Sequence, residues 1–246
     1  MSAEPLLVID DVHLHFGGVR ALNGVKLVVN SGEFLGVIGP NGAGKTTMFN
    51  VITGVLTPDS GSVKFDGHEL TRRTPDQICR LGIARTYQRV RSFSRLTVMQ
   101  NVMVPIVNRD RAKVSINEAR EIALMLLSRV GLSNYADVEA NRLNLFHRKK
   151  IELARALGAG ARIVLLDEVM AGLNAVEADA ASELLRALKQ EFSLTIVCIE
   201  HLMRIIMAVS DRVVVLDRGA TIASGTPAQV ADNPQVQRAY LGNEYA

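Results

Sequence analysis

The chain has 246 residues, of which 48% are hydrophobic, and a formal net charge of only +3. This length and hydrophobic content allow a sizeable core and argue against disorder. The weak and dispersed charge argues against a nucleic-acid partner. No uncharged apolar run is long enough to span a bilayer, and the first residues lack the basic start and apolar stretch of a signal peptide. We therefore expect a globular, cytoplasmic protein.

The first part of the chain is rich in predicted strands. Short apolar runs, punctuated by glycine-containing turns, predict strands at 6–9, 25–29, 34–38 and 62–65. A helix is predicted at 46–52, directly after a glycine-rich run. From about residue 96 the character changes, and helical periodicity predicts helices at 98–104, 116–130 and 148–157.

Strands return in the last third of the chain. They are predicted at 163–166, 195–199 and 213–216, with helical stretches at 177–191 and 202–209 between them. Strands that alternate with helices predict right-handed crossovers and a largely parallel sheet. The helical middle is therefore interpreted as an insertion into an α/β sheet domain.

The two cysteines give no sign of a disulfide or a metal site. Cys79 and Cys198 are far apart in the sequence and both lie in apolar-rich surroundings. We therefore expect two buried free thiols.

The glycine-rich run at 39–47 carries the clearest chemistry. It fits the phosphate-loop pattern of Gly, four residues and Gly-Lys-Ser/Thr, in which glycines let successive backbone N–H groups point at phosphate oxygens. Lys45 could reach the β- and γ-phosphates of a nucleotide, and the Thr46 hydroxyl could ligate Mg²⁺. The predicted strand before the run and the predicted helix after it make an accidental match improbable. The residues expected to bind ATP here are Gly39, Pro40, Asn41, Gly42, Ala43, Gly44, Lys45, Thr46 and Thr47.

A second motif places two carboxylates at the end of a predicted buried strand. Asp167 and Glu168 follow the four apolar residues 163–166. Ligands of open α/β sheets bind at the carboxyl ends of the strands. There Asp167 could hold Mg²⁺ through water, and Glu168 could polarise the water that attacks a γ-phosphate. Acidic residues often end strands, so this signal is weak alone, but together with the phosphate loop it predicts an ATP-hydrolysing site.

Two further polar residues are candidates by position. Gln88 lies at the border between the sheet part and the helical middle, where its amide could touch both Mg²⁺ and the attacking water. A lone glutamine is normally a solvated surface residue, so this role depends on the resemblance described next. His201 follows the predicted strand at 195–199, where it could donate to the γ-phosphate.

Taken together, these motifs resemble the ATP-binding-cassette (ABC) ATPases over nearly the whole chain. Residues 39–47 match the family's Walker A loop, and residues 163–168 match its Walker B strand. By resemblance, Gln88 is the Q-loop glutamine and His201 the switch histidine, and Phe16 lies where an aromatic ring stacks on adenine. The cofactors implied are ATP and Mg²⁺.

The signature and the D-loop depart from the family pattern. The signature usually reads Leu-Ser-Gly-Gly-Gln and contacts the partner subunit's ATP, but the aligned residues after Leu143 are Asn144, Leu145, Phe146 and His147. The Asn144 amide could still donate a hydrogen bond. A Cβ at 145 and 146 hinders close approach and disfavours a positive φ. In the D-loop, at 171–174, Asn174 replaces the usual Asp.

The resemblance also implies an architecture. It implies one ABC ATPase domain over residues 1–246, with a mostly parallel P-loop sheet core, an N-terminal antiparallel β part and an α-helical subdomain inserted at about 89–160. Within the family the chain looks most like the ATPase subunits of branched-chain amino acid importers. The segments that carry this likeness are 16–21, 82–88, 168–174, 199–201 and the tail from 225 to 242.

The partners follow from the same resemblance. It implies a dimer with a second ABC ATPase subunit, identical or paralogous, that docks on transmembrane permease subunits. The chain would then lie on the inner face of the cell membrane and be served indirectly by a solute-binding protein. The alternative function is a weakly hydrolysing ATP-binding half of an asymmetric heterodimer. A soluble P-loop kinase is a third reading, which His201 and the D-loop disfavour.

A cluster of apolar residues after Gln88 is the candidate docking face for the permease. Its members are Val90, Phe93, Leu96, Val98 and Met99. Clustered apolar residues on a surface mark partner sites. The alternative is that they form the core of the helical insertion itself.

Overall fold

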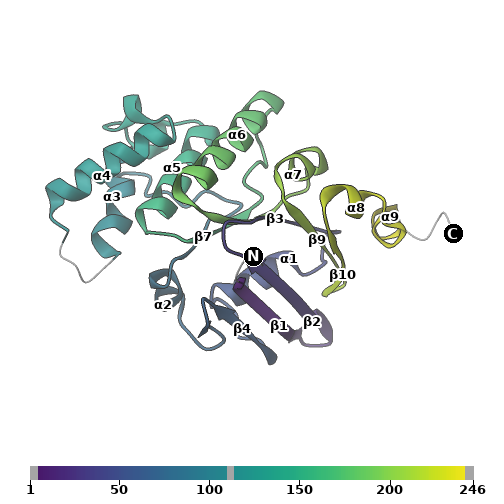
Figure 1. Ribbon diagram of the computed structural model, residues 1–246. Helices are drawn as coiled ribbons and strands as arrows, with labels where there is room; N and C mark the ends of the chain where they lie inside the picture. Colours follow the sequence, from purple (N-terminus) through teal and green to yellow (C-terminus); the bar gives the residue numbers. More distant parts are fainter. Residues whose placement is uncertain (1–4, 110–113, 242–246) are drawn as a thin grey trace.

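The structure is a computed structural model that describes residues 5–109 and 114–241 (Figure 1). The strands are β1 Pro5–Phe16, β2 Val19–Asn30, β3 Phe34–Ile38, β4 Ser60–Phe65, β5 His68–Glu69, β6 Ile83–Arg85, β7 Ile163–Asp167, β8 Thr195–Ile199, β9 Arg212–Asp217 and β10 Ala220–Gly225. The α-helices are α1 Lys45–Ile52, α2 Pro75–Arg80, α3 Val98–Asn108, α4 Ile116–Arg129, α5 Leu145–Gly158, α6 Ala175–Phe192, α7 Met203–Val209, α8 Pro227–Ala231 and α9 Pro234–Leu241. Short 3₁₀ turns lie at Ser133–Tyr135 and Ala140–Arg142.

The strands form two sheets. The N-terminal sheet is antiparallel, in the order β2-β1-β4-β5. The second sheet has the order β10-β9-β3-β8-β7-β6 and is parallel from β9 to β6, with β10 antiparallel at its edge. The prediction of a mostly parallel sheet with an antiparallel N-terminal part is thus confirmed.

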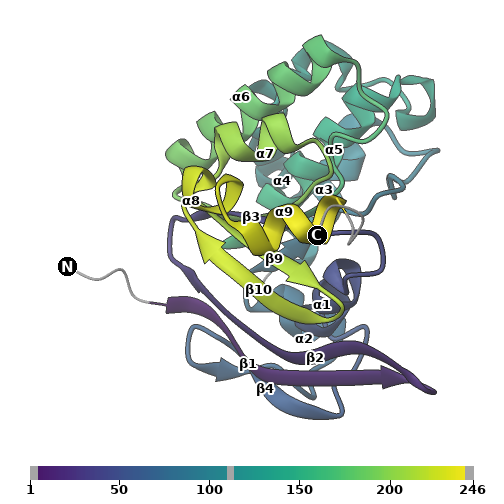
Figure 2. The same ribbon diagram turned by 90° about the vertical axis from the view of Figure 1, so that its right-hand side faces the viewer.

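The parallel sheet is covered on both faces. Its central strands β3, β7 and β8 are buried at every position. Leu35 and Val37 face a core shared with the antiparallel sheet and α1. Phe34 and Ile38 face a second core, shared with the helices. Figure 2 shows the resulting layers, with β1, β2 and β4 on one side of the parallel sheet and α4 to α7 on the other.

Among the described residues, three α-helices lie between β6 and β7. Helix α3 packs on α4 and α5, and α4 packs on α5. Capping boxes begin two of them, at Thr97 for α3 and at Ser115 for α4. The division into a core domain and a helical subdomain at about 89–160 stays a prediction, which this arrangement supports.

Two expectations about individual residues are wrong. Val98 was expected on a docking face, but it is fully buried in the core of the helices, because the first turn of α3 points it toward that core. Cys79 was expected to be buried, but it is exposed. Its neighbour Ile78 takes the inward face of α2, and the next residue of a helix points about 100° away. Cys198 is buried, as expected.

Within residues 5–109 and 114–241, every helix is too short or too polar to cross a bilayer.

The first glycine of the phosphate loop provides a stability test. A Cβ at Gly39 would collide with the backbone carbonyl oxygen of Leu216 at the end of β9. Gly42 has open space around it, and only its φ of 78° opposes a side chain. We expect Gly39→Ala to lower the free energy of unfolding by about 2–4 kcal/mol and Gly42→Ala by roughly 1–2 kcal/mol. Urea denaturation of both variants measures this, and equal losses would contradict the close approach.

Candidate functional site

The carboxyl ends of three neighbouring parallel strands bring the predicted site residues together. β3 pairs with β8, and β8 pairs with β7. The phosphate loop follows β3, Asp167 ends β7, and Glu200 and His201 follow β8. This is the edge at which open α/β sheets bind their ligands.

The side chain of Lys45 folds back onto the backbone of the phosphate loop. Lys45 is only 6% exposed, and its Nζ donates to the carbonyl oxygens of Gly39 and Pro40, each at 2.8 Å. Burial lowers the pKa of Lys45, and the nearby carboxylates of Glu168 and Asp167 oppose this shift. Gly44 precedes α1 without a side-chain cap. The first N–H groups of the helix are therefore placed to bind an anion.

The three predicted catalytic side chains meet at Glu168. One oxygen of its carboxylate accepts a hydrogen bond from the Gln88 amide at 2.7 Å, and the other lies 3.0 Å from Nε2 of His201. Gln88 follows β6 and His201 follows β8, so three separate segments supply the cluster. Glu168 itself has a φ of 52°, a conformation that costs energy in a residue with a Cβ.

A buried lysine holds the segment that follows Glu168. Nζ of Lys149, on α5, lies 2.6 Å from the carbonyl oxygen of Val169, 2.8 Å from that of Ala171 and 3.4 Å from that of Glu168. Burial lowers the pKa of Lys149, and nearby carboxylates, that of Glu200 foremost, oppose the shift. Its three bonds fix the backbone around the strained Glu168.

A buried carboxylate completes this support. Glu200 accepts a hydrogen bond from the Met170 N–H at 2.6 Å and is 3% exposed. Burial raises the pKa of Glu200, and its bond from Met170 and the charge of Lys149 oppose the rise. Neither Lys149 nor Glu200 was among the residues expected at the site. The spacing of Lys149 from the apolar Leu153 and Leu157 was the available signal, because it places all three on the buried face of α5.

The residues expected to hold Mg²⁺ fit that ion. The described ranges 5–109 and 114–241 contain no cluster of three His, Cys, Asp or Glu side chains that would bind a metal alone. Mg²⁺ in nucleotide sites takes only one or two protein oxygens, besides phosphate oxygens and water. Thr46 stands exposed in the first turn of α1, Asp167 ends β7, and Gln88 bonds to the neighbouring Glu168. These three could hold the ion, which would then neutralise phosphate charge.

An exposed aromatic ring lies at the end of β1. Phe16 is 51% exposed, directly before a turn in which Gly17 has a φ of 56°. A free ring face of this kind suits stacking against a base. The adenine contact stays a prediction.

The signature residues form the start of a helix. Asn144 caps α5 by accepting a hydrogen bond from the His147 N–H at 2.9 Å. Leu145 and Phe146 are both helical, and neither has a positive φ. This agrees with the expectation that a Cβ at these positions disfavours the left-handed conformation. The expected hindrance of a ligand's close approach stays a prediction.

The Phe146 ring packs against its own chain. It is half-buried against the helical core, with Nζ of Lys150 4.5 Å from its centroid. The His147 ring lies 4.7 Å from that of Tyr135, and burial lowers the pKa of His147. Asn174 of the D-loop is the cap of α6, in a capping box with Glu177. An asparagine fulfils this role as well as an aspartate does.

The glycine-rich loop, the lysine and the two carboxylates define a P-loop nucleotide site, and comparison with known proteins identifies its family. Residues 22–171 match the sequence model of the ABC transporter family. Residues 220–246 match a second model, described as branched-chain amino acid ATP-binding cassette transporter. The chain therefore belongs to the ABC transporter family, as an ATP-binding and ATP-hydrolysing subunit.

Two bacterial relatives of named function resemble the chain over nearly its whole length. It is 38% identical to the high-affinity branched-chain amino acid transport ATP-binding protein BraF of Pseudomonas aeruginosa, over 98% of this chain and 99% of that protein. It is 36% identical to the corresponding protein LivG of Escherichia coli, with the same coverage.

Solved structures of ATP-binding cassettes share the fold of the chain. The ADP conformation of MJ1267, an ATP-binding cassette of an ABC transporter, superposes with a TM-score of 0.89 at 29% identity, over 98% of this chain and 100% of that one. A dimeric, post-hydrolysis cassette of MJ0796 bound to ADP and Pi gives a TM-score of 0.81 at 26% identity, over 90% and 99%.

The contacts of Lys149 predict a loss of turnover without a loss of nucleotide binding. Lys149→Met removes the bonds that hold the backbone around Glu168, and a small misplacement of a catalytic group costs about a hundredfold in rate. We expect ATPase activity to fall by about that factor, with ATP affinity within about twofold of wild type. Lys26→Met, which removes an exposed lysine paired with Asp10 at 3.7 Å, is the control. Equal activity in the two variants would rule out this support.

Proposed function

We propose that the chain is the ATP-hydrolysing motor subunit of an importer for branched-chain amino acids. The observation that carries the proposal is the meeting of Gln88 and His201 on Glu168, beside a complete phosphate loop. The solute rests on the relatives BraF and LivG and on the match of residues 220–246.

The geometry suggests how each residue acts. Lys45 would exchange the carbonyl oxygens of Gly39 and Pro40 for phosphate oxygens when a nucleotide binds. Glu168 would polarise the attacking water, and Gln88 and His201 would release its carboxylate for that task. Mg²⁺ would supply charge neutralisation of the phosphates.

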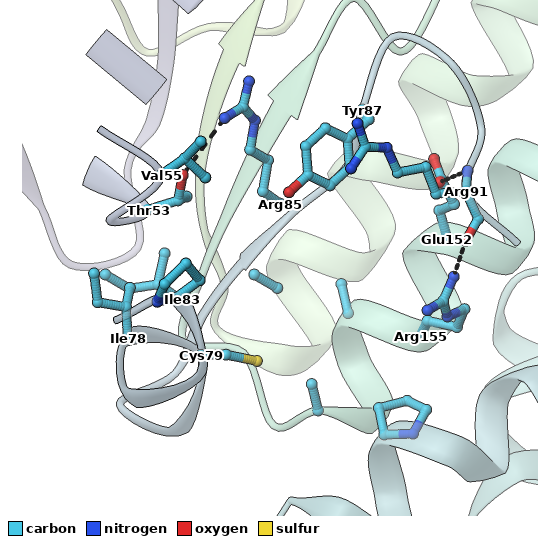
Figure 3. A pocket seen from close by; sticks show the side chains of 15 residues that line it. Thr53, Val55, Ile78, Cys79, Ile83, Arg85, Tyr87, Arg91, Glu152 and Arg155 are labelled. Carbon is cyan, nitrogen blue, oxygen red and sulfur yellow. Dashed lines mark hydrogen bonds between the residues drawn. The ribbon is translucent and has the colours of Figure 1, made fainter. Parts of the chain in front are cut away.

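We further propose that the permease docks in a groove between α2 and α5, which we call the α2–α5 groove (Figure 3). The groove has a volume of about 330 Å³, and its lining includes Ile78, Cys79, Tyr87, Arg91, Glu152 and Arg155. Phe93 stands beside it, 44% exposed, with the Arg155 guanidinium 4.8 Å from its ring centroid. The α2–α5 groove takes the place of part of the docking face that the sequence predicted, because one member of that face, Val98, lies in the core.

The groove lies between the segment that contains Gln88 and helix α5 of the helical middle. Tyr87 and Arg91 flank Gln88 in sequence, and Glu152 accepts a hydrogen bond from the Arg91 N–H at 2.6 Å. Burial raises the pKa of Glu152, and its bond from Arg91 and the neighbouring Arg155 oppose the rise. An occupant of the groove would thus touch residues next to the catalytic cluster. The assembly would include a second ABC ATPase and the permease, with this chain on the inner face of the membrane and a solute-binding protein outside.

Replacing the catalytic carboxylate tests the proposed function. Glu168→Gln keeps the size of the side chain but removes the base, so we expect ATP binding to persist and turnover to fall by at least about a hundredfold. Uptake of labelled leucine, isoleucine and valine by cells that depend on this chain should then stop. Near-normal turnover would contradict the role of Glu168. Lost turnover with unchanged uptake of all three amino acids would contradict the solute.

The altered signature leads us to propose unequal ATP sites. In this family each site joins the Walker A loop of one subunit to the signature of the other. The Walker A side of this chain is complete, whereas Phe146 and Leu145 occupy the positions at which a partner's phosphate would approach two glycines. Beside a paralogous ATPase with a regular signature, the site that contains Lys45 would be fast and the site that faces Phe146 slow.

A restored signature tests this inequality in the isolated chain, where both sites would carry the defect. Replacing Asn144 by Ser and both Leu145 and Phe146 by Gly should raise its ATPase activity about ten- to a hundredfold, the value of one regained hydrogen bond to a charged phosphate. The single variant Asn144→Ser shows how much of the gain in activity comes from the hydroxyl and how much from the two glycines. Vigorous turnover by the wild-type chain alone, unchanged by the restoration, would show that the signature is competent as it stands.

A further inference from the structure

A buried arginine touches the carboxylate expected to hold Mg²⁺. Arg85 ends β6, and Nη2 of its guanidinium donates to Oδ2 of Asp167 at 2.7 Å. Both side chains are only 5% exposed. An ion pair this deeply buried is screened little by solvent, and its planar donor group fixes the direction of the carboxylate.

The same guanidinium also reaches the helix of the phosphate loop. Its Nη1 donates to Oδ1 of Asn50 at 2.7 Å, with Oγ1 of Thr53 at 3.5 Å. Asn50 lies on α1, whose first residue is Lys45. Arg85 therefore connects β7, which ends in Asp167, to α1, which begins in the phosphate loop.

Aromatic rings hold the guanidinium in this position. Its central carbon lies 5.5 Å from the ring centroid of Phe49 and 4.9 Å from that of Tyr87. Figure 3 shows Arg85 beside Tyr87 with its bond to Thr53. Arg85 also lines the α2–α5 groove. A planar cation between rings has little freedom to turn away from Asp167.

We propose that Arg85 is a positioning residue for the reaction, which sets the orientation of Asp167 and its distance from the phosphate loop. With Oδ2 engaged by the guanidinium, Oδ1 is left for the ion or its water. The proposal rests on the proposed ATPase site. It concerns the cooperation between Mg²⁺ and nucleotide, so it can fail while Glu168 keeps its role.

The test measures binding rather than turnover. For wild type and Arg85→Met, the dissociation constant of the non-hydrolysable analogue AMP-PNP is determined by calorimetry in EDTA and in excess Mg²⁺. We expect Arg85→Met to leave the EDTA value within about twofold and to reduce the gain from Mg²⁺ by about tenfold, the usual effect of losing a residue behind a metal ligand. Arg80→Met, which removes an exposed arginine paired with Asp76, is the control and should match wild type.

Two more variants separate positioning from folding. Arg85→Lys keeps a cation in the buried site but cannot reach Asn50 and Asp167 with one planar group, so it should fold and still lose part of the Mg²⁺ gain. In an Asp167→Asn background, Arg85→Met should change the Mg²⁺ gain no further, because both act through one carboxylate. Equal weakening in EDTA and in Mg²⁺, or an unchanged gain in a folded Arg85→Lys protein, would overturn the proposal.

Discussion

Burial of the parallel strands on both faces is the constraint on which the rest of the structure depends. Every residue of β3, β7 and β8 is withdrawn from water, so these strands carry apolar side chains along nearly their whole length. Charged side chains stand only where these strands end. Asp167 and Glu200 accordingly stand at the carboxyl ends of β7 and β8, and the phosphate loop stands at the end of β3. The fold therefore concentrates charge at one edge of the sheet.

Charges gathered at that edge have to be compensated locally. Asp167 is paired with Arg85, and the Lys149 ammonium is surrounded by three carbonyl oxygens. Removing one partner of a buried pair costs about 3–5 kcal/mol, because an uncompensated charge is left behind. The same bonds that satisfy these groups also fix the backbone of Glu168 in its strained conformation. Stability and catalytic geometry are thus supported by one set of contacts.

The sequence predicted the residues of the site better than the buried residues that hold them in place. Local patterns reveal the phosphate loop, the strand before Asp167 and the histidine after β8, because each residue type and its place beside a strand can be read from the sequence. Arg85, Lys149 and Glu200 are different, because each acts on a segment distant in the chain. The spacing along α5 could have shown that Lys149 is buried, but no local pattern shows which distant segment it contacts. The place of Val98 stayed open between a docking face and the core for a related reason. An apolar residue at the start of a helix suits a core and a docking face equally, and only packing decides between them.

Hydrophobic periodicity predicted the fold class but not every strand. Alternating strands and helices predicted the parallel sheet, because each strand there is a short apolar run. The three-residue β6 and the edge strand β10 lack such a run, and the sequence analysis did not predict them. The α2–α5 groove could not be predicted either. Its lining joins α2 and the nearby segment around Tyr87 to α5, which lies far along the chain and meets them only after folding.

The packing of Phe146 bears on both the stability and the activity of the subunit. A glycine at that position would expose the apolar surface that the ring now covers, and it would weaken the start of α5, since glycine is a poor helix former. Phenylalanine therefore covers apolar surface and starts the helix better than glycine would. In the proposed pair of unequal sites the same ring would stand in the way of a phosphate, so stability and activity would be opposed at one residue. A partner subunit with a regular signature would then supply the activity that this exchange removes.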